Sequence, residues 1–229
     1  QILSSATNVS LIGMSIRGGR KTQTFNEGGG LYWEGLNSHI NFHDVTFEGN
    51  TAYYGGGLYL VYSSNGDVID MDQVIVHANR ATAAAGGLGI NFGGYPQFSL
   101  RNSQVYSNTA YEGGGIYFQG TPEPFGTLSA QIQNTQIYSN TASLSAGFEN
   151  HSGDTAVPVV LSNSHVYHNQ AGYYGGAIGN YGALDIVSTT LAANSAGLRG
   201  GGLYDYEGGQ VNIEKSTFSD NIAQFGGGR

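Results

Sequence analysis

The sequence contains no cysteine, which excludes a disulfide framework, cysteine–zinc sites and thiol chemistry. Proline is scarce, with 4 residues, although glycine is abundant at 38 of 229. Abundant glycine without proline excludes collagen, which needs a strict Gly-X-Y period and much proline. Hydrophobic residues make up 39% of the chain, which is enough for a packed core, so the composition does not predict disorder.

Charged residues are also few, at 10% of the chain against a usual share of about 25%. The formal net charge is −8, and the only basic cluster is Arg17, Arg20 and Lys21. Nucleic acids and anionic membrane surfaces need clustered basic residues, so neither is an expected partner. No run of 18 apolar residues predicts a membrane-spanning helix. No secretory leader is recognisable at Gln1, so we expect a processed chain or a fragment.

One motif repeats along the chain: an apolar residue, two variable residues, Asn, one variable residue and Ala. Its copies FEGNTA, VHANRA, VYSNTA, IYSNTA, VYHNQA, LAANSA and FSDNIA begin at Phe47, Val76, Val105, Ile137, Val166, Leu191 and Phe218. A glycine-rich block follows most copies, and a weaker first copy has Ile16 in the apolar slot and Gly19 in the Asn slot. Successive apolar anchors are 31, 29, 29, 32, 29, 25 and 27 residues apart.

This period, with short alternating stretches rich in Val, Ile, Thr and Tyr, predicts a solenoid of short strands. A propeller blade needs about 40 residues and fits less well. The expected fold is all-β: a right-handed parallel β-helix of about eight coils, with roughly 29 residues per coil. We expect residues 1–229 to form a single β-helix domain.

Each slot of the motif has an expected structural role. The apolar anchors should point inward and stack on their copies about 4.8 Å away in neighbouring coils. Asn tolerates the left-handed bend at the end of a strand, and stacked Asn side chains can hydrogen-bond from coil to coil. The Ala should lie inside a tight corner, and the glycines where the backbone turns with positive φ. The predicted structural Asn ladder consists of Asn50, Asn79, Asn108, Asn140, Asn169, Asn194 and Asn221.

The pairing of F-x-x-N with G-G-[AILV] resembles the passenger repeats of chlamydial polymorphic membrane proteins. More broadly, it is similar to the repeats of bacterial and archaeal surface β-helix proteins. The resemblance extends from about Ile16 to Gly228. It implies a β-helix in an extracellular setting, and adhesion as a function, because members of the family are autotransported adhesins. Family repeats often carry cysteines, which this chain lacks.

The sequence predicts no catalytic residues, no metal site and no cofactor. Pectinase-like hydrolases need close carboxylates with a His and a basic residue, and the chain has no Asp-Asp pair and no Gly-His-Gly. The only acidic cluster is Asp67, Asp70 and Asp72. Asp70 and Asp72 would share one strand face, which suits a cation, although a solvated edge is the simpler interpretation. His165 and His168 should point in different directions, which argues against a zinc site.

Two outward features are candidates for binding or modification. Four successive coils carry an aromatic residue two positions before the ladder Asn, which predicts an exposed strip of His77, Tyr106, Tyr138 and Tyr167. The strip is interpreted either as stacking between coils or as a surface that packs against another chain or a sugar. The sequons at Asn8 (NVS) and Asn150 (NHS) are candidate glycosylation sites in a secreted chain.

The two ends show no recognisable polar cap and are nearly in phase. Joining the C-terminus of one copy to the N-terminus of another separates Gly228 from Ile16 by 17 residues, within the 15 to 22 found inside the chain. Contacts of this kind produce open filaments. We therefore expect a secreted, extracellular or cell-surface structural protein whose copies stack end to end, and not an enzyme. The alternatives are an adhesin or autotransporter-passenger fragment that binds a host or glycan, and a polysaccharide lyase or glycosidase.

Overall fold

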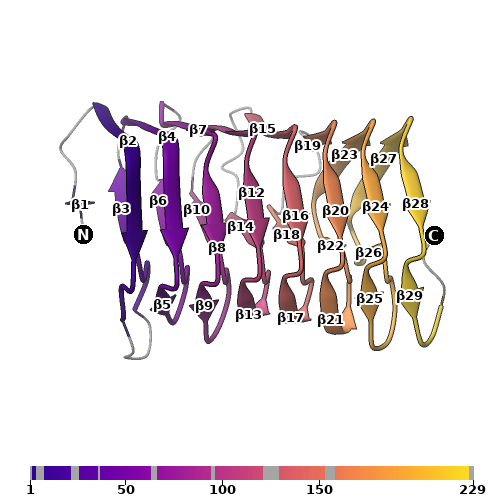
Figure 1. Ribbon diagram of the computed structural model, residues 1–229. Coiled ribbons are helices and arrows are strands. Elements are labelled where there is room, and N and C mark those ends of the chain that lie inside the picture. Colours follow the sequence, from indigo (N-terminus) through magenta and orange to yellow (C-terminus); the bar gives the residue numbers. More distant parts are fainter. Residues whose placement is uncertain are drawn as a thin grey trace.

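The computed structural model describes residues 2–3, 8–21, 26–35, 37–62, 66–93, 96–120, 129–152 and 158–226. This part of the chain is a parallel β-solenoid of about seven turns, with about 29 residues per turn. The turns follow one another along a single axis, with the two ends of the chain at opposite extremes (Figure 1). The expected all-β class and repeat length are confirmed. The eight anchors enclose seven complete turns rather than eight, and the right-handed sense stays a prediction.

Each turn passes through three β-sheets in the same order. The chain runs from sheet A into sheet B, bends within sheet B, and crosses sheet C before a glycine-rich corner returns it to sheet A. One such turn consists of β6 (Leu58–Tyr62) in sheet A, β7 (Val68–Asp72) and β8 (Ile75–His77) in sheet B, and β9 (Arg80–Ala81) in sheet C. The strands pair in parallel with their counterparts one turn away.

The remaining strands extend these three sheets along the axis. Sheet A also contains β1 (Ile2–Leu3), β3 (Leu31–Gly35), β10 (Leu88–Phe92), β14 (Ile116–Gly120), β18 (Phe148–His151), β22 (Ile178–Asn180) and β26 (Leu203–Asp205). Sheet C also contains β5 (Thr51–Ala52), β13 (Thr109–Glu112), β17 (Thr141–Leu144), β21 (Gln170–Tyr174), β25 (Ser195–Ala196) and β29 (Ile222–Ala223).

Sheet B has two halves, one on each side of the bend. Its longest strands, β2 (Asn8–Arg17) and β4 (His39–Glu48), run through both halves. On the side of β7 follow β11 (Gln97–Arg101), β15 (Ser129–Gln133), β19 (Val159–Ser162), β23 (Ala183–Val187) and β27 (Gln210–Glu214). On the side of β8 follow β12 (Gln104–Tyr106), β16 (Gln136–Tyr138), β20 (His165–Tyr167), β24 (Thr190–Ala192) and β28 (Thr217–Ser219).

The apolar anchors form a continuous column inside the solenoid. Val105, for example, pairs with Val76 on one side and with Ile137 on the other. The six anchors from Phe47 to Leu191 have no exposed surface. Fully burying a side chain of this size stabilises a fold by about 1.5–3 kcal/mol, so the column is a main source of stability.

The bend before each ladder Asn depends on a residue with positive φ, but that residue is not the Asn. The left-handed conformation belongs to the preceding residue, as at Ala78 and Ser107, which both have a φ of 54°. This corrects the expected role of Asn in the backbone bend. The outward residue makes the bend, because the Asn must keep its side chain directed inward at the neighbouring coil.

The glycine-rich corner brings successive coils close to the ladder. A Cβ added to Gly87 would lie 2.9 Å from Nδ2 of Asn108 and 2.6 Å from the carbonyl oxygen of Gly115. Any side chain at Gly87 would therefore push two coils apart or displace the Asn from its partners.

The substitution Gly87→Ala should destabilise the solenoid by about 1–3 kcal/mol, the usual cost of overpacking a filled site. Gly93→Ala is the matched control, because a Cβ there would have only the carbonyl oxygen of Tyr62 within 4 Å, at 3.9 Å. Denaturant unfolding of both variants measures the difference. Equal stability of the two variants would show that the corner has room for a methyl group.

Candidate functional site

The seven predicted ladder asparagines lie in one column and are joined by their side chains. Oδ1 of Asn108 accepts hydrogen bonds from the backbone N–H and from Nδ2 of Asn79, both at 3.0 Å. Nδ2 of Asn108 donates to Oδ1 of Asn140 at 3.1 Å and to the carbonyl oxygen of Val76 at 2.9 Å. The same pattern continues from Asn50 to Asn221.

This column is structural, because the bonding capacity of each internal Asn is used within the fold. The asparagines from Asn50 to Asn194 are at most 1% exposed. In the first coil Gly19 occupies the slot, and its backbone N–H donates to Oδ1 of Asn50 at 2.8 Å. The ladder therefore starts one coil late, and no ladder group is free to hold a ligand between Asn50 and Asn194.

A second polar ladder, which is not part of the predicted motif, lies at the bend within sheet B. Oγ of Ser103 accepts from the backbone N–H of Val74 at 3.0 Å, and Oγ of Ser164 accepts from that of Thr135 at 3.1 Å. Thr189 continues the column by accepting from the backbone N–H of Ser164 at 3.2 Å. The signal was present in the sequence, since these residues stand two positions before their anchors.

The predicted aromatic strip is a stack of rings that runs along the solenoid axis. Tyr106 stacks on His77 and on Tyr138 at centroid distances of 4.8 Å, and Tyr138 stacks on Tyr167 at 4.9 Å. The interplanar angles are between 6° and 10°. Because each inner ring has a neighbour on both faces, the strip offers ring edges and hydroxyl groups to a partner. This arrangement favours the stacking interpretation over a platform for sugar rings.

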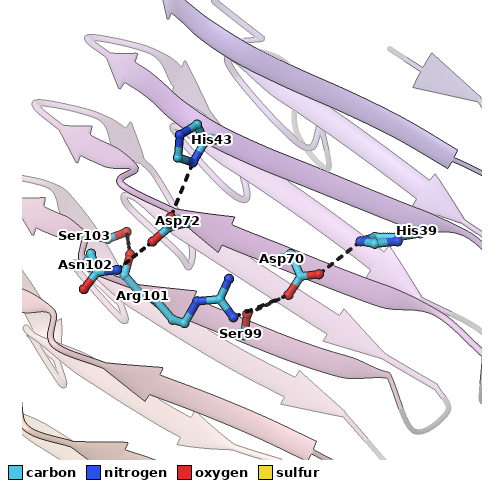
Figure 2. A network of polar contacts seen from close by, with 8 residues as sticks. All are labelled: His39, His43, Asp70, Asp72, Ser99, Arg101, Asn102 and Ser103. Carbon is cyan, nitrogen blue, oxygen red and sulfur yellow. Dashed lines mark hydrogen bonds and ion pairs between the residues drawn. The ribbon is translucent and has the colours of Figure 1, made fainter.

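Asp70 lies on the outer face of sheet B, where side chains of the two neighbouring strands surround it (Figure 2). Its carboxylate is 3.1 Å from Nε2 of His39 and accepts from Oγ of Ser99 at 2.9 Å. Arg101 approaches to 4.0 Å. Exposed ion pairs contribute about 0–1 kcal/mol each, so these contacts add little to the stability of the three coils that they connect.

Asp72 makes parallel contacts on the same strand face, and Asp67 does not belong to the group. Asp72 is 3.4 Å from Nδ1 of His43 and accepts from Nδ2 of Asn102 at 2.7 Å (Figure 2). Asp67 is buried and accepts from the backbone N–H of Ser38 at 2.8 Å. Within the described ranges, no group of three or more His, Cys, Asp or Glu side chains is arranged to hold a metal ion.

His165 and His168 lie on the surface of the solenoid on either side of the buried Val166. His165 belongs to the outer column of Gln136, and His168 has a φ of 54° in the bend before Asn169.

No helix in the part of the chain that the structure describes is long and apolar enough to cross a membrane.

The two sequons differ in accessibility. Asn8 is exposed at the start of β2. Asn150 has no exposed surface, and its Nδ2 donates to Oδ1 of Asn180 at 2.8 Å and to the carbonyl oxygen of Ala183 at 3.0 Å. A glycan on this nitrogen is incompatible with the folded coil, which corrects the expectation at Asn150.

A further cluster, which the sequence did not predict, lies at the corner where the chain passes from sheet C to sheet A. A cavity of about 270 Å³ lies beside β13 and β14, and its walls include Tyr54, Tyr111, Glu112, Tyr117 and Gln119. Ala83 and Ala84 complete its lining. Tyrosines, a carboxylate and an amide around a small hollow can bind a ligand with an apolar body and a polar or charged group. We call this hollow the tyrosine pocket.

Glu149 is the strand neighbour of Tyr117 in the next coil and is only 1% exposed. Its Oε1 lies 3.9 Å from Nδ1 of His151. Burial, followed by the nearby carboxylate of Glu112, raises the pKa of Glu149 to about 8. Burial also lowers the pKa of His151. Glu149 is therefore mainly protonated and uncharged at neutral pH.

A sequence signal for Glu149 existed in the repeat. The position after the first residue of a sheet A strand is Tyr at Tyr32, Tyr59, Tyr117 and Tyr204. Glu149 occupies this slot in the repeat whose glycine block is degenerate, so the pattern breaks twice in one coil. The alignment alone could mark the position as unusual, but its burial depends on the neighbouring coils.

No protein-family model, curated protein or solved structure matches this chain. The structure shows the parallel β-solenoid fold that the resemblance to surface β-helix repeats implies, but membership of that family is not shown.

Asn108→Ala should destabilise the solenoid by about 1–3 kcal/mol, because backbone and side-chain groups of Asn79 and Asn140 lose their partners in the interior. Gln131→Ala, on the exposed outer face of β15, is the control and should have little effect. Thermal and denaturant unfolding measure both. An unchanged melt for Asn108→Ala would contradict the structural role of the ladder.

Glu149 should make stability depend on pH. The pKa of Glu149 is about 8 in the folded chain, against an ordinary value near 4.5. Between these two pH values the folded chain keeps a proton that the unfolded chain has lost. Rising pH therefore favours the unfolded state, by about 1.4 kcal/mol per pH unit from this group, and the contribution becomes constant above the folded pKa.

Glu149→Gln removes this titration and keeps the shape of the side chain. As pH rises from about 5.5 to about 8.5, the free energy of unfolding of the variant should increase relative to that of wild type. Denaturant unfolding at both pH values measures this difference. Parallel pH profiles for the two proteins would show that Glu149 ionises normally in the folded chain.

Proposed function

We propose that this protein is an extracellular structural protein whose copies stack end to end along the solenoid axis. The main observation that supports the proposal is that inward-column apolar residues are exposed in the two terminal coils. Met14 in β2 occupies the inward column of Val45, and Ile213 in β27 occupies that of Ile186. Val45 and Ile186 have no exposed surface, whereas Met14 and Ile213 are 43% and 44% exposed.

The strand edges at the two ends of the solenoid carry corresponding positions of the repeat motif. Phe218 of β28 and Ile16 of β2 are both anchors, and both lie in parallel strands with one unpaired side in the described part of the chain. An unpaired strand edge readily accepts another parallel strand. A second copy placed in phase would therefore bury the anchors and pair the exposed backbone groups.

One feature of the proposed junction differs from the interior. Nδ2 of Asn194 donates to Oδ1 of Asn221, but Asn221 would face the first coil of the next copy, where the slot holds Gly19. Glycine provides no side-chain oxygen, so the ladder would be interrupted once per subunit. Filaments built this way should break at the junctions before their subunits unfold.

The alternatives from the sequence receive less support from the described surfaces. The stacked rings of Tyr106 and Tyr138 present edges, which is unfavourable for a flat sugar ring. A glycan-binding adhesin and a polysaccharide lyase or glycosidase stay predictions. An extracellular location agrees with the low charge and the resemblance to surface proteins, and antibody labelling of intact cells tests it.

Electron microscopy of purified protein tests the stacking proposal. Eight rungs at about 4.8 Å each predict an axial repeat of roughly 38 Å, with β-sheets continuous across the junction. The variants Met14→Asp and Ile213→Asp should abolish filaments, because a charge would be buried without a partner at the junction. Gln131→Asp on the outer face is the control and should leave assembly intact.

Circular dichroism verifies that both end variants keep the β-solenoid. Particles that remain monomeric at all concentrations, or that associate only side by side, would contradict the proposal. Coordinates in which the end coils are covered by further residues of the same chain would contradict it equally.

A further inference from the structure

The tyrosine pocket lies on the flank of the solenoid and takes no part in the proposed stacking. Its walls come from three successive coils: Tyr54 precedes β6, Ala83 and Ala84 precede β10, and Tyr111 and Tyr117 belong to β13 and β14. Tyr111 is 52% exposed, so one wall of the pocket is open to solvent.

The pocket is small and has mixed chemistry. Its volume of about 270 Å³ is slightly below that of most ligand pockets, which measure about 300–1,000 Å³. An extended polysaccharide does not fit such a volume, whereas a single compact group does. Two alanines form an apolar surface, three tyrosines add aromatic walls, and Glu112 and Gln119 supply polar groups.

The lining of the pocket contains one carboxylate, Glu112, and no basic residue of the described chain. Burial and then the carboxylates of Glu149 and Glu112 raise the pKa of Tyr117, and Glu112 also contributes to the raised pKa of Tyr54. Glu149 is mainly uncharged at neutral pH and is not part of the lining, so Glu112 is the carboxylate that the pocket offers to a ligand.

Glu149 lies beside Tyr117 in the next coil, is 1% exposed and does not line the pocket. Burial raises its pKa to about 8, so it is mainly uncharged at neutral pH and needs no positive partner. A positively charged ligand would therefore be attracted by Glu112, the carboxylate in the lining.

We propose that the tyrosine pocket is a binding site for a small organic ammonium group, held by Tyr54, Tyr111 and Tyr117 and by the carboxylate of Glu112. Aromatic rings attract cations through their negative faces, and aromatic cages are the common way of recognising alkylammonium groups. The carboxylate adds direct charge attraction. The apolar alanines accommodate the carbon substituents of the ammonium, which distinguishes this site from one for an inorganic cation.

Titration of the full chain with tetramethylammonium chloride, followed by calorimetry and by NMR of the tyrosine rings, tests the proposal. A parallel titration with n-butylammonium distinguishes a quaternary head group from a lysine-type side chain, and sodium chloride at equal ionic strength controls for screening. We expect saturable binding of at least one ammonium ion and none of sodium.

Two variants connect that binding to the pocket. Glu112→Gln and Tyr111→Leu should each weaken ammonium binding by about tenfold, which is the size of a well-placed cation–π or charge contact. Glu48→Gln on the outer face of sheet B and Tyr173→Leu, which alters a tyrosine that is 50% exposed, are the matched controls and should bind like wild type. Unchanged thermal melts show that the variants are folded.

Absence of saturable ammonium binding would overturn the proposal, as would equal competition by sodium. Binding of glucose in place of ammonium, with the same sensitivity to Tyr111→Leu, would also overturn it and identify a neutral sugar site. The pocket lies on the flank, away from the strand edges at the ends of the axis, so the outcome of these measurements is independent of filament formation.

Discussion

The complete hydrogen bonding of the inward asparagines is the constraint on which the rest of the solenoid depends. Each internal Asn is buried, and an unpaired group on it would cost about 1–3 kcal/mol. Its partners lie in the neighbouring coils, so the bonds form only if adjacent coils keep the same register and spacing. Gly87 and Gly115 permit that spacing, and the apolar anchors fill the interior beside the ladder.

Because the interior is this uniform, the outer surface is where coils can differ without breaking the stack. Tyr106 and Tyr138 show the ordinary outcome, in which like residues stack at 4.8 Å. Glu149 is the exception, since it occupies the slot of Tyr117 in the coil with the degenerate glycine block. The departure from the repeat, more than the repeat itself, therefore marks the residues with unusual chemistry.

The two proposals use separate surfaces of the same rod. Stacking depends on strand edges at the ends of the axis, near Met14 and Ile213, whereas the tyrosine pocket lies on the flank around Tyr111 and Glu112. A filament of stacked copies would repeat the pocket at a regular interval along its side. Such an array would bind a surface with many ammonium groups far more strongly than one pocket could, because later contacts become intramolecular.

The sequence by itself determined the all-β class, the repeat length, and the residues of the anchor and Asn columns. The sequence determines these features because residues of the same type recur at a nearly constant spacing, and coils of that length place like residues on top of one another. Only the tertiary structure placed the left-handed φ at Ala78, buried Asn150, and surrounded Glu149 with Glu112 and His151. Those properties depend on contacts between coils about 30 residues apart, and the burial of a side chain is decided by the coils on both sides of it.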